Sequence, residues 1–205
     1  MISKQTIELD RREQILKISL RQFAKNGYHK TKISDIVREA GVAQGTFYWY
    51  FKSKEAIALE IIQNGQIHFL EVVAQGYRQT TGSVQDAIKS SEKLFEDLFN
   101  FAENNKDLIE LLLKGVESED SVYQLINETW VKIEEAFQRN IKRATELGIL
   151  PEKDPSLQSA LLISLIEGTL LRWLFGPKDS TLTKKTANEL AKEMVRFEFF
   201  GLLGI

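Results

Sequence analysis

The sequence predicts an all-α protein of about nine helices. Along most of the chain, apolar residues recur at spacings of three and four, which is the period of a helix that buries one face. The 3 prolines of this 205-residue chain are Pro151, Pro155 and Pro177, so none of them interrupts the first 150 residues. The sequence contains no strand pattern, internal repeat or low-complexity segment, and its 43% of hydrophobic residues suffices for a folded core.

The first two expected helices end at glycines. An apolar stripe runs through residues 12–26 and stops at Gly27, where a left-handed cap can end a helix. The next helix is short and reaches Ala40, before Gly41. Thr31 and Ser34 are the side chains that can cap its start.

The third expected helix forms a helix-turn-helix with the second. It covers residues 44–50 and follows a glycine-containing turn at 41–43, the kind of connection that this motif uses. The motif as a whole extends over 32–51. A long fourth helix then begins after Ser53, which has N-cap chemistry, and runs to about residue 75.

The remaining helices are expected to be longer, and glycine or proline stands at several of the joints between them. We expect these five helices over residues 84–102, 105–116, 121–147, 155–175 and 184–203.

Composition argues against an enzyme. The chain has no cysteine, which removes thiol catalysis, zinc–thiolate sites and disulfides. Its 2 histidines, His29 and His68, lie on different expected helices, so a histidine metal site or a Ser-His-Asp triad is not expected. A phosphate loop of the G-x-x-x-x-G-K type is also missing. We therefore expect no catalytic residue, no metal and no cofactor.

No membrane-spanning segment is expected either. The most apolar stretches, around residues 160–166 and 169–175, are interrupted by Glu167 and Arg172 and fall short of the roughly 20 apolar residues that a spanning helix needs. The charged N-terminal residues lack the apolar core of a secretory signal. We expect a cytoplasmic protein without a membrane partner.

Charge divides the chain into two parts. Residues 1–55 hold 11 Lys+Arg against 6 Asp+Glu, a charge of +5, whereas residues 56–205 hold 16 against 23, a charge of −7. The formal net charge of −2 therefore conceals a basic N-terminal part. Such a part fits a phosphate-rich partner, although a merely solvated basic face has the same composition.

The three consecutive aromatic residues of the third expected helix cannot all be buried. At 100° per residue, Phe47 and Phe51 lie about 40° apart and define the inward face, which puts Trp49 on the opposite side. Tyr48 and Tyr50 flank the inward face. DNA is a partner that could cover this surface. Alternatively, the two tyrosines lie at the edge of the core and Trp49 meets another helix.

Residues around this helix have the chemistry that DNA contacts require. Gln44 and Thr46 can hydrogen-bond to base edges, and Gly45 permits a close approach. Lys54, at the start of the fourth helix, can combine its ammonium group with free helix N–H groups on a phosphate. Contacts to thymine methyls, sugars and phosphates suit the aromatic residues Tyr48, Trp49 and Tyr50.

Residues 27–57 read GYHKTKISDIVREAGVAQGTFYWYFKSKEAI and resemble the DNA-binding domain of the TetR family of bacterial transcriptional regulators. The resemblance covers about residues 9–69, and beyond them only the helix pattern agrees. The residues in register are Gly27, Thr31, Asp35, Ile36, Ala40, Gly41, Val42, Gly45, Thr46, Phe47, Tyr48, Phe51, Lys54 and Glu55.

The resemblance implies a double-stranded DNA operator as the partner. Lys32 stands where a small hydroxyl residue is common, which favours another phosphate contact over a capping role. Ser34 stands where some members have a long base-reading side chain, so readout from the second helix is expected to be weak. The implied DNA contacts are Thr31, Gln44, Thr46, Tyr48, Trp49, Tyr50 and Lys54.

The resemblance also implies that residues 70–205 form an effector-binding and dimerisation domain. Members of the family dimerise through their last two long helices, and the helices expected over 155–175 and 184–203 are both too apolar to stand alone. Paired across a twofold axis, they would form a four-helix bundle and present two recognition helices to the half-sites of a palindromic operator.

The middle helices should enclose the effector pocket, again by resemblance. Glu167, the most unusual polar residue of its apolar stretch, either contacts a cationic or hydrogen-bonding ligand or pairs with a basic residue across the dimer. Bulky candidates for the lining, each of them otherwise plain core, are Phe69, Phe95, Phe99, Trp130, Phe137 and Trp173.

These observations together predict a homodimeric transcription factor. We expect a repressor that releases its operator on binding a small apolar or amphipathic effector. The alternative is an effector-independent DNA-binding or architectural protein of the same fold.

Overall fold

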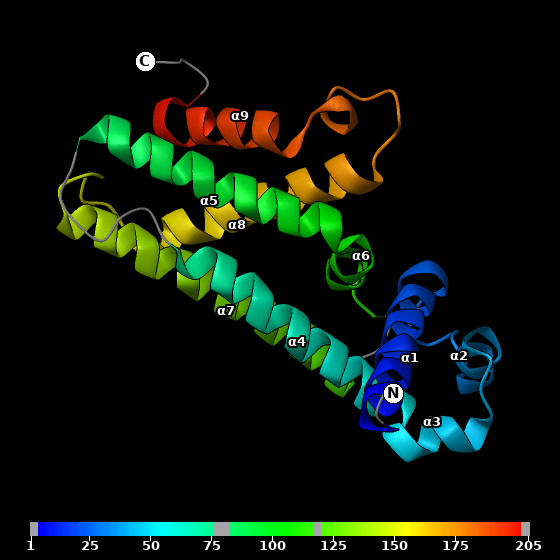
Figure 1. Cartoon of the computed structure of the whole chain (residues 1–205). Helices are drawn as coiled ribbons and strands as arrows, with labels where there is room; N and C mark the ends of the chain where they lie inside the picture. Colours follow the sequence, from blue (N-terminus) through cyan, green and yellow to red (C-terminus); the bar gives the residue numbers. More distant parts are fainter. Residues whose placement is uncertain (1–3, 76–82, 117–119, 202–205) are drawn as a thin grey trace. The chain divides into compact units, whose positions relative to one another are not determined.

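The computed structural model describes residues 4–75, 83–116 and 120–201, and the regular elements within them are nine α-helices and one short 3-10 helix (Figure 1). The all-α prediction is therefore confirmed. The helices group into two compact units. The first unit contains the residues up to Gln66 together with Asp107–Thr129, and the second contains Ile67–Lys106 and the residues from Trp130 onward.

The first unit is built on the N-terminal helices. It holds α1 (Lys4–Asn26), α2 (Ile33–Ala40), α3 (Gln44–Tyr50) and nearly all of α6 (Lys106–Lys114), together with the first parts of α4 (Lys54–Ala74) and α7 (Ser121–Glu146). The sequence pattern did not indicate that α6 and the start of α7 group with these helices. The fully buried core of the unit includes Ile15, Phe23, Ile36, Phe47, Ile57 and Ile62.

Helix α1 begins at Lys4, earlier than the expected start at residue 12. No glycine or proline lies between these positions, so a helix that has formed further along continues backward through them. The apolar stripe located only the part of the helix that meets the core, beginning near the buried Ile15. The end of the helix is as expected, because Gly27 has φ +83° and stops it.

The start of α2 is capped differently from the prediction that named Thr31 and Ser34. Lys32 occupies the N-cap position, and its backbone N–H donates to the Asp35 carboxylate over 3.2 Å. The Thr31 hydroxyl faces the other way and donates to the carbonyl oxygens of Gln22 (3.1 Å) and Gly27 (2.9 Å). The Asp35 carboxylate thus satisfies the N–H of the N-cap residue, while the N-cap side chain itself makes no capping hydrogen bond.

The second unit holds α5 (Val84–Asn104), α8 (Pro155–Phe175) and α9 (Ala187–Phe200), together with the remaining parts of α4 and α7. Helices α5 and α9 lie side by side (Figure 1). Both start with reciprocal caps. The Ser83 hydroxyl accepts from the Asp86 N–H over 3.2 Å, and the Thr186 hydroxyl accepts from the Glu189 N–H over 3.2 Å.

Other helix ends also differ from the prediction, among them the start of α9 and the end of α6. The last helix was expected over 184–203, but a 3-10 turn covers Leu182–Lys184 and α9 begins only after Thr186. The Trp173 indole N–H donates to the Lys185 carbonyl oxygen over 2.9 Å and holds the intervening segment out of the helix. Residues 202 and 203 lie outside the described residues. Helix α6 stops at Lys114, short of the expected residue 116, because Gly115 has φ +64°.

Helix α8 is the most apolar helix of the described chain. By length and composition alone, it is the one described helix that could cross a membrane. It also carries Glu167 and Arg172. Ile166 and Leu170 are fully buried in the core of the second unit, so one side of the helix is occupied by protein.

Candidate nucleic-acid interface

Helix α3 presents an aromatic face to solvent. Phe47 and Phe51 are buried, with 0% and 3% of their surface exposed, and their ring centroids lie 5.8 Å apart. On the outer side, Trp49 is 78% exposed and Tyr48 is 50% exposed. The inward pair is therefore the one that the helical spacing predicted. In the described chain, Trp49 does not pack on another helix, so the alternative is not supported.

The N-terminal end of α3 is open. Gln44 and Gly45 are exposed, Thr46 is half-buried, and a Cβ added to Gly45 would meet nothing within 4 Å. Packing therefore does not require a glycine here, whereas a close approach of DNA would. Gln44 and Tyr48 are four residues apart and share one face of the helix. Tyr50 is half-buried beside Phe51.

Helix α2 and its turn fix the direction of α3. Gly41 has φ +64°, and the Val42 N–H donates to the Val37 carbonyl oxygen over 3.0 Å, which closes the C-terminal end of α2. Glu39 ties this end to α1, because both Arg21 and Gln22 donate to its carboxylate. These contacts, the bond from Gln22 first, lower the pKa of Glu39 below its usual value.

The predicted DNA contacts at the start of α2 differ in their exposure to solvent. Lys32 and Ser34 are exposed, so both are accessible to a DNA backbone. Thr31 is only 2% exposed, and its hydroxyl donates inside the unit. A DNA contact through Thr31 stays a prediction, and its position gives the side chain a structural role in addition.

Lys54 is engaged inside the first unit. Its ammonium group donates to the carbonyl oxygens of Tyr28 (2.8 Å), Thr31 (3.1 Å) and His29 (3.2 Å), and it lies 4.4 Å from the centre of the Tyr28 ring. Burial lowers the pKa of Lys54, and the charge of Asp120 partly opposes this shift. Burial, with the carboxylates of Asp120 and Glu55, raises the pKa of Tyr28 to about 12. The three donor positions of Lys54 are thus used by the protein itself, whereas the sequence suggested a phosphate as their partner.

Lys52 is a candidate contact that the sequence analysis did not single out. It lies exposed in the turn between α3 and α4, and within the described residues its ammonium group has no hydrogen-bond or ion-pair partner. A lysine beside the exposed face of a recognition helix is suited to a phosphate. The sequence signal is the pair of lysines around Ser53, of which only Lys54 stands at the start of a predicted helix.

The structure places the six bulky pocket candidates in the second unit as an aromatic cluster of two groups, one of Phe69 with Trp130 and one of Phe95, Phe99, Phe137 and Trp173. Trp130 is half-buried, and the other five are at most 6% exposed. Ring-centroid distances are 6.1 Å for Phe69 and Trp130, and 5.6 Å for Phe99 and Trp173. Phe95 lies 6.2 Å from Phe99 and 6.3 Å from Phe137. A ligand among these rings would have to separate them.

Glu167 is half-buried on α8. Burial raises the pKa of its carboxyl group, and the negative charge of Glu134 raises it further. The nearby charge is therefore one that repels Glu167. Both interpretations of this residue, a ligand contact and an ion pair across a dimer, would supply the positive or hydrogen-bonding group that its surroundings call for.

Comparison with known proteins agrees with this geometry. Residues 15–61, which span most of α1, all of α2 and α3, and the start of α4, match the family model described as bacterial regulatory proteins, tetR family. Residues 15–61 thus carry the helix-turn-helix domain of the TetR family of bacterial transcriptional regulators. The match ends near the point where α4 passes into the second unit.

Relatives of similar length extend the likeness beyond the family model. The uncharacterised HTH-type transcriptional regulator YdgC of Bacillus subtilis is 27% identical over 197 residues, which are 95% of this chain and 94% of YdgC. The HTH-type transcriptional regulator AcrR of Shigella flexneri is 26% identical over 190 residues, 88% of this chain and 86% of AcrR.

Solved structures share the fold of the whole chain. The fatty acid degradation regulator FadR of Bacillus halodurans has a TM-score of 0.76 at 22% identity, covering 94% of this chain and 96% of FadR. The transcriptional regulator FadR of Bacillus subtilis, solved in complex with stearoyl-CoA, has a TM-score of 0.74 at 21% identity, covering 93% of this chain and 98% of that one. These likenesses concern the fold.

Proposed function

We propose that this TetR-family regulator is a homodimeric repressor that releases a palindromic DNA operator when a small apolar or amphipathic effector binds. The proposal assigns DNA reading to residues 9–69, and effector binding and dimerisation to residues 70–205. The observation that carries the DNA half is the outward aromatic face of α3, where Trp49 is 78% exposed. Water is a poor partner for so large an apolar surface, and the wall of a DNA groove is a better one.

The exposed residues divide by chemistry into two groups. Gln44 and Thr46 offer hydrogen bonds to base edges, and Tyr48 and Trp49 offer apolar contact to thymine methyls and sugars. Phosphate contacts fall to the exposed Lys32 and Lys52, to Tyr50 and to the main chain at the start of α4. The basic character of residues 1–55, with a charge of +5, supports this assignment.

The dimer part of the proposal is supported by apolar side chains that α8 and α9 leave exposed. Leu157 and Leu161 on α8 are 59% and 64% exposed, and Phe197 on α9 is 43% exposed. Leu161 and Phe197 also line an apolar hollow of about 570 Å³ between these helices and the end of α7. The same helices of a second copy would cover this face, as the family's mode of dimerisation implies.

The effector part is supported by the aromatic cluster of the second unit and by the stearoyl-CoA complex of the B. subtilis FadR. Because the rings of the cluster pack against each other, an effector would favour a state in which they have moved apart. A ligand that prefers one arrangement of the dimer shifts the equilibrium toward it, and DNA binding falls by the same coupling factor. Helix α4 contributes residues to both units and is the natural element to transmit the change.

The proposal is tested by selecting duplexes from a random pool with the full chain, and then screening long-chain acyl compounds and other lipophiles by thermal shift. We expect one palindromic sequence to be enriched, and at least one compound to raise the melting temperature and to lower the affinity for that duplex. A pool without enrichment contradicts the DNA half. Enrichment without any stabilising compound favours the alternative, an effector-independent DNA-binding or architectural protein. Cytoplasmic localisation is part of the proposal, because the operator lies on the chromosome.

A further inference from the structure

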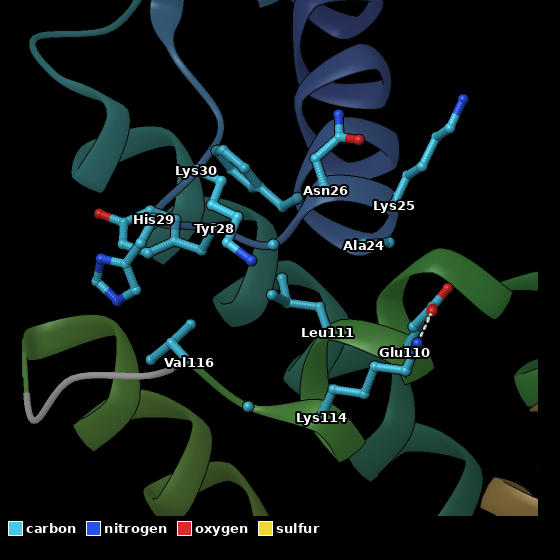
Figure 2. A pocket seen from close by; sticks show the side chains of 13 residues that line it. Ala24, Lys25, Asn26, Tyr28, His29, Lys30, Glu110, Leu111, Lys114 and Val116 are labelled. Atoms are coloured by element: carbon cyan, nitrogen blue, oxygen red, sulfur yellow. Dashed lines mark hydrogen bonds and ion pairs between the residues drawn. The ribbon is translucent and has the colours of Figure 1, made fainter.

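A second cavity lies inside the first unit, apart from the residues assigned to the effector. It has a volume of about 280 Å³ and is bounded by residues 23–30 on one side and residues 110–116 on the other (Figure 2). The two walls are chain reversals. Gly27 ends α1 with φ +83°, and Gly115 ends α6 with φ +64°. We call this space the α1–α6 cavity.

One side of the α1–α6 cavity is apolar. Phe23 and Leu111 are buried, with 1% and 3% of their surface exposed, and Val116 is half-buried. Phe23 and Leu111 expose little surface to a ligand in this space, and the half-buried Val116 exposes more, so the apolar contact available to a ligand is small. The volume lies just below the range of about 300–1,000 Å³ typical of drug-sized ligands, so the ligand would be small.

Of the lysines that line the α1–α6 cavity, Lys30 is the one whose side chain enters the space without an ion-pair partner among the described residues. Lys114 forms an ion pair with Glu110, and the His29 imidazole lies 3.7 Å from the Asp120 carboxylate. Within the described part of the chain, the Lys30 ammonium group has no hydrogen-bond or ion-pair partner. In Figure 2 the Lys30 side chain runs into the space above Leu111, whereas the Lys25 side chain runs away from α6.

We propose that the α1–α6 cavity binds a small organic carboxylate with an apolar body. The carboxylate pairs with the Lys30 ammonium group, and the body lies against Phe23, Leu111 and Val116. A cation without an ion-pair partner beside apolar side chains favours a single negative charge on an apolar body, because a neutral ligand lacks the charge-assisted bond and a fully polar anion makes no apolar contact. The ligand would link the segment that leads into α2 with the end of α6, and so stabilise the arrangement of the first unit.

The test uses the full-length, 15N-labelled protein titrated with benzoate, with benzamide as the neutral probe of the same shape and acetate as the anion without an apolar body. We expect benzoate to shift the backbone amides of residues 27–30 and 111–116 saturably in the millimolar range. Benzamide should bind at least about tenfold more weakly, because it lacks the charge-assisted pair. Acetate should not saturate.

The matched variants are Lys30→Gln and Lys25→Gln, which each remove one lysine charge of the lining. We expect Lys30→Gln to weaken benzoate binding about tenfold or more with an unchanged melting temperature, and Lys25→Gln to retain affinity within about twofold. The proposal is overturned if benzoate produces no saturable shifts, if the shifts lie outside both walls of the cavity, or if the two variants bind benzoate equally well.

Discussion

Lys52 and Lys54 are two positions apart and have different roles. Lys54 donates to three carbonyl oxygens inside the first unit, at 2.8, 3.1 and 3.2 Å, whereas Lys52 is exposed and without a partner in the described chain. Charge alone does not distinguish them. We therefore expect Lys54 to serve stability and Lys52 to serve phosphate binding.

Replacing each lysine by glutamine measures this difference. Lys54→Gln should lower the free energy of unfolding by about 2 kcal/mol, because a charged donor to three carbonyls is lost. Its salt slope of DNA binding should stay unchanged. Lys52→Gln should leave stability unchanged and reduce the salt slope by about 1 per protomer. Thermal melts and DNA titrations at several salt concentrations supply both quantities. A lowered slope with unchanged stability in Lys54→Gln would mean that its ammonium group leaves the carbonyls for a phosphate.

Glu167 gives a prediction of pH dependence. Its folded pKa is raised by burial and by Glu134, so its ionisation opposes folding, and stability falls as pH rises from the unfolded pKa through the folded one. Glu167→Gln keeps the shape and removes the charge. We expect the variant to melt about 2–4 °C higher at neutral pH, the shift produced by about 1 kcal/mol in a chain of this size, and to match the wild type well below pH 4.

The control for Glu167 is Glu193→Gln, at an exposed position of α9, which should change neither melting curve. A lower melting temperature for Glu167→Gln at neutral pH would contradict the prediction. That result would indicate a cationic partner for Glu167, as the hypothesis of an ion pair across the dimer requires.

At the scale of elements, α3 is unusual because it has a glycine, Gly45, at an exposed position near its start. Gly45 lies in its first turn, although glycine in a helix costs about 0.5–1 kcal/mol relative to alanine. Nothing lies within 4 Å of the Cβ that alanine would add. Packing in the described chain does not require this glycine, which fits the proposed close approach of DNA.

Gly45→Ala should therefore move stability and function in opposite directions. We expect the free energy of unfolding to rise by about 0.5–1 kcal/mol and the affinity for the selected operator to fall at least about tenfold, because the methyl group lies between helix and DNA. Differential scanning calorimetry and fluorescence anisotropy measure the two effects. Unchanged affinity would show that DNA does not come close to this position.

Most elements followed from the sequence because local rules and packing agree in them. Gly27 and Gly41 end their helices in the left-handed conformation, and the inward pair Phe47 and Phe51 follows from helical geometry. The misplaced ends have competing partners. The cap of α2 is formed by Asp35, and the start of α9 is held back by the hydrogen bond of Trp173 to Lys185. Trp173 and Lys185 are 12 residues apart, so their bond is not visible in a local pattern, whereas Asp35 lies only 3 residues after Lys32 and is a local signal.

The candidate site was predictable to a similar degree. The helical periodicity of α3 alone predicts which side of the helix faces solvent, because it places Trp49 opposite the buried Phe47. The engagement of Lys54 was not predictable, because its carbonyl partners lie 23–26 residues earlier in the chain. The α1–α6 cavity has no sequence signal, since it arises where two chain reversals face each other.

At the scale of the whole molecule, the proposed dimer gathers the apolar residues that the single chain leaves exposed. Leu161→Glu, at a position 64% exposed in the single chain, would place a charge inside that interface. We expect the dissociation constant of the dimer to rise about a hundredfold, for a cost of about 3 kcal/mol. Val131→Glu, at a 56% exposed position on α7, is the control and should leave the dimer intact. Sedimentation velocity distinguishes the outcomes, and equal behaviour of the two variants would contradict the assigned interface.

The unequal charge of the two parts of the chain, +5 for residues 1–55 and −7 for residues 56–205, also matters for the whole molecule. The proposed dimer would bring two basic N-terminal parts of +5 to the DNA and keep two acidic parts of −7 in its remainder. The near-neutral total is compatible with specific DNA binding because the field that a phosphate meets is local. Affinity at low salt should therefore depend on the N-terminal lysines rather than on the net charge of the chain.

The central claim is that the outward face of α3 reads DNA. The measurement that tests it most directly is the affinity of wild type and Trp49→Ala for the selected duplex and for a scrambled duplex of equal length at one salt concentration. We predict that Trp49→Ala melts like the wild type, because its side chain is 78% exposed, and loses about 1–3 kcal/mol of discrimination between the two duplexes. Full discrimination by a well-folded Trp49→Ala variant would contradict the account.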